Sequence, residues 1–208
     1  MIILGVETTA HTFGIGIIEA SENECKILTN VKDSYTSEDI GMIPDKIALH
    51  HQEVADKVLK QAFEEANVTW KKVDAISYSA GPGLDPVLWE GYHKAKRWAD
   101  EHNLSLIPVN HCCAHLSIGK VVNKLEDPMY LYVSGVNTQI IFQDEQGKYH
   151  VIGETLDIGL GNMLDKFGRI LKLGFPAGAK IEQISKSGNY VELPYAIKGM
   201  DVSFSGIL

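Results

Sequence analysis

The stretch "IILGVETTAHTFGIGII", residues 2–18, decides the fold. An apolar run from Ile2 to Val6 is followed by the polar turn "ETTAHT", residues 7–12, and by a second apolar run from Phe13 to Ile18. Two apolar runs around a short polar turn predict strand, turn and strand. The pattern recurs in "MYLYVSGVNTQIIF", residues 129–142, around the turn "SGVNTQ". We therefore predict an internal duplication of one supersecondary unit.

Helical patterns alternate with these strands. Apolar residues in 47–66 follow the spacing of an amphipathic helix, and a strand "DAISYSA" comes next, at 74–80. A second helix is predicted from Asp85 as N-cap and Pro86 as first residue, and a third over 160–171. Such alternation is typical of an α/β protein. The charged segment "NKLEDP", 123–128, suits a connection between lobes, so we expect domains at 1–128 and 129–208.

Composition excludes several classes of protein. The 208 residues carry 19 basic and 27 acidic side chains, a net charge of −8, so no field over the whole surface attracts nucleic acid or anionic lipid. Neither a membrane span nor a secretory leader is expected, which favours a cytoplasmic protein without a membrane partner. The 3 cysteines form an odd set that suits reduced thiols, and they contain no CxxC motif.

The stretch "VNHCCAHLSIGK", 109–120, places His111 and His115 four residues apart. On a helix these two imidazoles lie one above the other and can bind one cation. The alternative is that two ordinary histidines share a helix face. No glutamate follows His111, so the motif is not the HExxH of a zinc protease, which needs that residue as its base.

Three further stretches leave a structural and a functional interpretation open. The two polar turns are either anion sites built from backbone N–H groups or ordinary hairpin turns. In "GETLDIGLGNMLDKFGR", 153–169, Asp165 lies off the apolar stripe of the predicted helix. It is either a solvated surface charge or a ligand for a ribose hydroxyl. In "FPAGAKIEQISK", 175–186, Gly178 is predicted at a turn and Glu182 in the first turn of a helix.

Two basic or histidine-rich segments are interpreted as structural. The run "KAKR", 94–97, is more typical of a solvated helix face than of an RNA-binding patch. His50 and His51 lie in the first amphipathic helix, and isolated histidines rarely bind a ligand.

Six stretches in order resemble one family over the whole chain. They are "GVETTAHTFGIGI", "SAGPGL", "VNHCCAHL", "LYVSGVNTQ", "GETLDIGLGNMLDKFGR" and "LPYAIKGMDVSFSG". Together they are similar to the tRNA N6-adenosine threonylcarbamoyltransferases, in particular the catalytic subunit of the archaeal and eukaryotic KEOPS complex. The resemblance implies an actin-like, Hsp70-like ATPase fold with duplicated RNase H-like lobes, the second of them incomplete here. It also implies an enzyme.

The resemblance further implies ligands and partners. A divalent metal, iron or zinc, is expected at His111, His115 and Tyr132. An adenylate, either threonylcarbamoyl-AMP or ATP/AMP, is expected at the residues that match the family's nucleotide site: Tyr132, Val133, Ser134, Gly135, Val136, Asp165, Gly178 and Glu182. The implied reaction transfers threonylcarbamoyl to N6 of adenosine 37 in tRNAs that read ANN codons. The implied partners are a small kinase-like subunit, a dimerising subunit and tRNA held through the complex.

The sequence departs from the family's pattern at several positions. Val136, Ala177 and Ala179 stand where glycine, glycine and proline are usual, and Asp85 and Trp89 replace a glycine and an arginine. The chain ends at "DVSFSGIL", before the segment that carries the family's metal-binding aspartate. We therefore expect an apolar face left without cover. The alternative function is an inactive KEOPS-binding or nucleotide-binding paralogue.

Overall fold

The computed structural model describes residues 1–22, 24–36 and 43–208. It divides into two units, Met1–Val121 and Val122–Leu208, each described here by itself. The sequence placed the change of lobe at 128/129. In the structure the boundary between the units lies between Val121 and Val122, inside the helix His111–Asn123.

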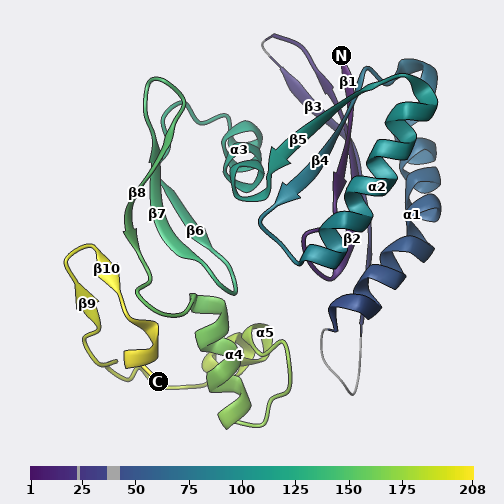
Figure 1. The fold of residues 1–208 in the computed structure, drawn as a ribbon. Helices are drawn as coiled ribbons and strands as arrows, with labels where there is room; N and C mark the ends of the chain where they lie inside the picture. Colours follow the sequence, from purple (N-terminus) through teal and green to yellow (C-terminus); the bar gives the residue numbers. More distant parts are fainter. Residues whose placement is uncertain (23, 37–42) are drawn as a thin grey trace. The chain divides into compact units, whose positions relative to one another are not determined.

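A five-stranded sheet forms the centre of the first unit (Figure 1). Its strands are β1 (Ile2–Glu7), β2 (Thr12–Ala20), β3 (Cys25–Ser34), β4 (Ala75–Gly81) and β5 (Ser105–Asn110). The order is β3-β2-β1-β4-β5. The first three strands pair antiparallel, whereas β4 and β5 pair parallel to β1. The parallel pairs require crossover connections, which α1 (Pro44–Ala66) and α2 (Asp85–His102) supply.

The core of the first unit lies between the sheet and these two helices. Alternate strand residues such as Leu4, Phe13, Ile15 and Ile76 are fully buried there. The opposite set of residues in β1, among them Gly5 and Glu7, faces the other side of the sheet, where α3 (His111–Asn123) lies. The carboxyl ends of β1, β4 and β5 therefore lead to one edge, beside the start of α3.

The second unit repeats the beginning of the first. Strands β6 (Tyr130–Val133), β7 (Thr138–Gln143) and β8 (Tyr149–Glu154) form an antiparallel sheet in chain order. Helices α4 (Leu160–Ile170) and α5 (Gly178–Ser185) follow, then a small hairpin of β9 (Ile197–Lys198) and β10 (Asp201–Val202). Both units thus open with three antiparallel strands, which confirms the predicted duplication and the α/β class. Large apolar side chains of this unit are exposed, among them Leu131, Val151 and Ile170.

Two predicted helix starts were wrong by a short distance. Helix α2 includes Asp85, and Leu84 is its N-cap residue, because the backbone of Asp85 already follows the helix. Helix α5 begins at Gly178 itself, so Gly178 is not in a turn and Glu182 lies beyond the first turn. In the described part of the chain, none of the helices combines the length and the apolar composition needed to cross a bilayer.

Candidate functional site

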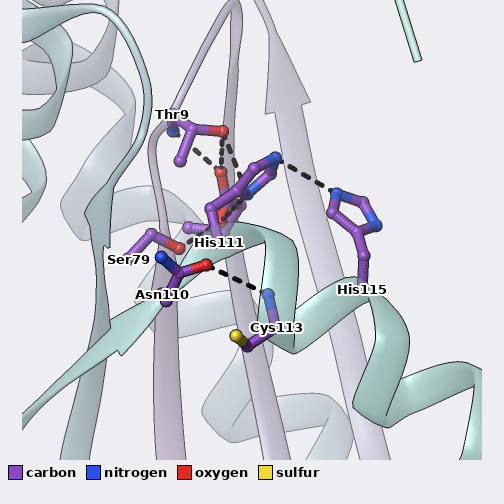
Figure 2. A network of polar contacts seen from close by, with 7 residues as sticks. Thr9, Ser79, Asn110, His111, Cys113 and His115 are labelled. Carbon is purple, nitrogen blue, oxygen red and sulfur yellow. Dashed lines mark hydrogen bonds and ion pairs between the residues drawn. The ribbon is translucent and has the colours of Figure 1, made fainter. Parts of the chain in front are cut away.

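His111 and His115 face each other at the start of α3. The side-chain oxygen of Asn110 accepts the backbone N–H of Cys113 at 3.1 Å, a cap that fixes the first turn of the helix. The two rings then lie at i and i+4, with their centroids 4.5 Å apart and their planes nearly perpendicular. Their Nε2 atoms are 3.2 Å apart (Figure 2). The sequence prediction that these two imidazoles share one helix face is confirmed.

Glu7, at the end of β1, lies behind His111. Its Oε2 atom is 3.3 Å from Nδ1 of His111, and the Thr9 hydroxyl is 3.4 Å from the same nitrogen. The carboxylate also accepts the backbone N–H of Thr9 at 2.8 Å and short hydrogen bonds from the hydroxyls of Thr9 and Ser79. Figure 2 shows Thr9, Ser79 and His111 converging on this point. Sequence analysis did not select Glu7 or Ser79.

These contacts determine the charges in the cluster. Desolvation raises the pKa of Glu7, but the hydrogen bonds from Ser79 and Thr9 outweigh it and leave the pKa below its ordinary value. Desolvation lowers the pKa of His115, and the neighbouring His111 lowers it further. At neutral pH the cluster therefore holds an ionised carboxylate and a neutral His115 imidazole, the form in which histidine binds metals.

The histidine pair fits a divalent metal. Two imidazole nitrogens bound about 2.0–2.1 Å from one tetrahedral ion lie about 3.3–3.4 Å apart. The observed separation of 3.2 Å is slightly shorter than, and close to, that geometry. Within residues 1–22, 24–36 and 43–208, however, no three His, Cys, Asp or Glu side chains converge on one point, so these two nitrogens make only part of a coordination sphere.

The turn between β1 and β2 is held from three directions. Thr8 is 1% exposed and packs on Gly91 of α2, where an added Cβ would lie 2.9 Å from the Thr8 Cβ and overlap its hydroxyl. The Thr9 carbonyl accepts the Leu84 N–H at 2.9 Å. The buried His51 donates to the Ala10 carbonyl at 3.1 Å. This packing fixes Thr9, and through it the carboxylate of Glu7.

A groove of about 480 Å³ adjoins the cluster. The sheet face that includes Gly5 and Gly16 forms one wall, and α3 residues Ala114 and Ile118 form the other. Glu7, His111 and His115 line one end of it. An apolar groove with a few convergent polar groups is typical of a small-molecule site.

In the second unit, the turn after β6 is bonded to the start of α4. The Ser134 and Gly135 carbonyls accept the N–H groups of Gly161 and Asn162, each at 3.1 Å. The Ser134 hydroxyl accepts the N–H groups of Val136 at 3.2 Å and Asn137 at 2.8 Å. The Val136 and Asn137 N–H groups belong to the turn that sequence analysis considered for phosphate, and they are already hydrogen-bonded. A phosphate would have to replace those bonds.

Val136 does not distort this turn. It is absent from the described residues with positive φ, and its side chain is 70% exposed. A β-branched residue cannot readily adopt a positive φ, but this turn does not require one, because it is built without a left-handed residue. Tyr132 and Val133 precede the turn in β6. The Tyr132 side chain is 9% exposed, on the covered face of its sheet.

Asp165 lies against the start of α5. Its Oδ1 atom accepts the Ala177 N–H at 2.8 Å, which places the carboxylate next to Gly178. Glu182 is exposed on α5. The structure thus brings Asp165 and Gly178 together, as it brings Ser134 and Gly135 to the start of α4.

Asp157 forms a second carboxylate centre that sequence analysis missed. It accepts hydrogen bonds from the hydroxyls of Ser203, at 2.5 Å, and Ser205, and from the Ile158 N–H at 2.7 Å. These bonds hold the pKa of Asp157 well below its ordinary value, chiefly through Ser203 and Ser205. They tie the segment "DVSFSG" to the loop before α4.

The remaining sequence candidates have structural partners. Lys94 and Arg97 both pair with Asp56 of α1, and Lys96 pairs with Asp100. His50 pairs with Asp33. Trp89 is 58% exposed and stacks on His93. These ion pairs give "KAKR" and His50 structural partners, and the interpretation that they bind no RNA or other ligand stays a prediction.

Comparison with known proteins decides the family. The family model for tRNA N6-adenosine threonylcarbamoyltransferase matches residues 25–208. The chain belongs to this family. Two similar relatives, both named tRNA N6-adenosine threonylcarbamoyltransferase, come from Thermococcus sibiricus and Thermococcus kodakarensis. Each is 49% identical over 209 residues, and the match covers 100% of this chain and 63% or 62% of the relative.

A longer relative joins the same region to other sequence. The protein from Methanobrevibacter smithii is named a probable bifunctional tRNA threonylcarbamoyladenosine biosynthesis protein. It is 43% identical over 208 residues, which are 100% of this chain and 38% of that protein. Among solved structures, YeaZ from Pseudomonas aeruginosa is similar with a TM-score of 0.49 and 14% identity, over 74% of this chain and 65% of that chain. This chain spans a little under two thirds of the Thermococcus members of the family.

Proposed function

We propose that this chain carries the metal-binding part of a threonylcarbamoyltransferase site. The reaction is the transfer of threonylcarbamoyl from threonylcarbamoyl-AMP to N6 of adenosine 37 in tRNAs that read ANN codons. The observation that carries the proposal is the pair of Nε2 atoms 3.2 Å apart on α3, with the carboxylate of Glu7 behind one ring. Membership of the family supplies the substrate class.

The residues of the site have separate roles in this proposal. His111 and His115 hold a divalent ion, iron or zinc, with Tyr132 as a further ligand. Such an ion supplies Lewis-acid polarisation of the transferring group. Ser134 and Val136 hold the adenylate phosphate by exchanging the internal hydrogen bonds of their N–H groups for bonds to it, and Gly135 contributes the N–H group between them. Asp165 and Gly178 contact the ribose, with Glu182 further along α5.

Partners and location follow from the same proposal. The net charge of −8 makes independent tRNA binding weak, because nucleic-acid affinity depends mainly on cations that neutralise phosphates. The lysines and arginine of "KAKR" are also engaged with Asp56 and Asp100. We therefore assign tRNA binding to a KEOPS-type complex with a small kinase-like subunit and a dimerising subunit, in the cytoplasm.

Heat stability with ligands tests the binding half of the proposal. A ligand at 100 times its Kd stabilises the folded state by about 2.7 kcal/mol, which for a chain of this size raises Tm by roughly 5–10 °C. Zinc should produce this shift in the wild type and lose it in His111→Ala and His115→Ala. His150→Ala is the matched control, because His150 pairs with Asp144 in the second unit and should leave the shift intact.

Product analysis tests the transfer half. The chain, zinc or iron, threonylcarbamoyl-AMP and an unmodified tRNA with adenosine 37 are incubated, and the tRNA nucleosides are separated by mass. Threonylcarbamoyladenosine that requires His111 would support the transferase. Intact binding of metal and adenylate without that product, even with the complementing subunits, would favour the binding paralogue instead.

A further inference from the structure

We propose that Glu7 is the positioning residue of the metal pair. Its carboxylate accepts the Nδ1–H of His111 and so holds the imidazole in the tautomer whose Nε2 lone pair faces the cation beside Nε2 of His115. This inference rests on the proposed function, because it gives the second nitrogen of His111 a task at the same site. Nothing in the sequence motif HxxxH identifies this carboxylate.

The tautomer follows from the donors and acceptors around the ring. An ionised carboxylate only accepts hydrogen bonds, so the hydrogen between Glu7 Oε2 and His111 Nδ1 must belong to the ring. A neutral imidazole carries one N–H, and its other nitrogen is then an acceptor. The 3.3 Å separation is a long hydrogen bond, supported by the Thr9 hydroxyl oxygen at 3.4 Å from the same nitrogen. Both acceptors lie on the Nδ1 side of the ring.

The carboxylate is itself held in place. Its Oε1 atom accepts the N–H and hydroxyl of Thr9, and its Oε2 atom accepts the Ser79 hydroxyl. These donors come from the β1–β2 turn and from β4, two elements fixed by sheet pairing. Glu7 therefore links the rigid sheet to the first residue of α3. Its side chain remains 42% exposed, on the side of the groove.

Glu7 is not placed as a third ligand of the same ion. It approaches Nδ1, whereas the shared cation position lies at the Nε2 atoms of the two rings, on the opposite edge of His111. A carboxylate, a histidine and a metal in line form a common outer-shell arrangement, and loss of such a carboxylate typically lowers metal affinity about 10–100-fold. The alternative is that Glu7 only ties β1 to β4.

Zinc affinity and imidazole NMR of the 208-residue chain separate these roles. Zinc Kd is measured by chelator competition, and the two ring nitrogens of His111 are assigned by long-range proton–nitrogen spectra at about pH 8, above the ordinary histidine pKa. Glu7→Gln keeps the volume of the side chain, and we expect a Kd about 10–100-fold higher and a His111 ring no longer fixed as Nδ1–H. Ser79→Ala, which removes one donor to Glu7, should give a smaller change in the same direction.

Asp144→Asn is the matched control. Asp144 accepts from His150 at 2.6 Å, so this variant also removes a carboxylate–histidine pair, but in the second unit, which does not contain Glu7, His111 or His115. It should leave zinc Kd and the His111 spectrum unchanged. Circular dichroism establishes that each variant is folded before the comparison.

Two results would overturn the inference. One is a wild-type His111 with its hydrogen on Nε2; the other is a folded Glu7→Gln with the same tautomer and a zinc Kd within about twofold of the wild type. A third result is possible, in which the wild type binds no zinc, its His111 carries the hydrogen on Nδ1, and Glu7→Gln loses that tautomer. In that case the positioning by Glu7 stands and the metal site of the proposed function fails.

Discussion

Replacement of Gly91 by alanine tests the packing that fixes the β1–β2 turn. In an open helix interior, glycine to alanine stabilises by about 1 kcal/mol. At Gly91 the new methyl group would lie 2.9 and 3.0 Å from two Thr8 carbon atoms and overlap the Thr8 hydroxyl. Thr8 is 1% exposed and cannot move into solvent. Overpacking of this kind costs about 1–3 kcal/mol, which exceeds the helix gain on average, so we expect a net loss of about 1 kcal/mol and at most about 2 kcal/mol.

Gly119→Ala is the matched control, because an added Cβ in α3 meets nothing within 4 Å. It should stabilise by up to about 1 kcal/mol, so the two variants should differ by the overpacking cost, about 2 kcal/mol. Urea unfolding followed by tryptophan fluorescence measures both. Trp70, Trp89 and Trp98, the 3 tryptophans of the chain, all lie in the first unit and report its unfolding. Equal midpoints for Gly91→Ala and Gly119→Ala would refute the packing argument.

Three other perturbations have defined outcomes. Burial lowers the pKa of His51 to about 4, so as the pH falls the unfolded chain binds a proton at this histidine before the folded chain does. The free energy of unfolding should therefore decrease by about 3 kcal/mol from pH about 6.5 to 4. Urea midpoints taken across that range measure this slope, and His51→Gln should flatten it. Asp157→Asn should speed amide hydrogen exchange at Ser205, whose N–H donates to the Asp157 carboxylate. The effect should be strongest at neutral pH, because the pKa of Asp157 is lowered and the stabilisation by its ionised form is lost as the pH falls through that pKa. Equal exchange rates in the wild type and the variant at neutral pH would contradict this prediction. Asp165→Ala should cost about 1 kcal/mol by removing the acceptor for the Ala177 N–H, and unchanged exchange at Ala177 would count against that bond.

Periodic patterns predicted most of the fold. The short apolar runs around Leu4 and Ile15, separated by a polar turn, were sufficient to predict β1 and β2. The duplication was visible because both copies need the same apolar runs. The i, i+4 spacing of His111 and His115 was informative for the same reason, since helix geometry alone places those rings together.

Contacts between distant elements were not visible in the sequence. Glu7 and Ser79 are 72 residues apart, and only the parallel pairing of β1 with β4 brings them together. Asp157 meets Ser205 across 48 residues by a similar tertiary contact. The glutamate in "VETT" was a possible signal, because a carboxylate at the end of a buried strand needs donors. Its partners depend on sheet order, which one sequence without relatives does not define.

X-ray absorption of zinc bound to the chain tests the central claim most directly. The account predicts one equivalent of zinc with imidazole nitrogens at about 2.0–2.1 Å, and loss of this ligation in both His111→Ala and His115→Ala. His150→Ala should retain the wild-type spectrum, because its histidine pairs with Asp144 elsewhere. Zinc without imidazole ligands, or the same spectrum in the His111 and His115 variants, would contradict a metal site on α3.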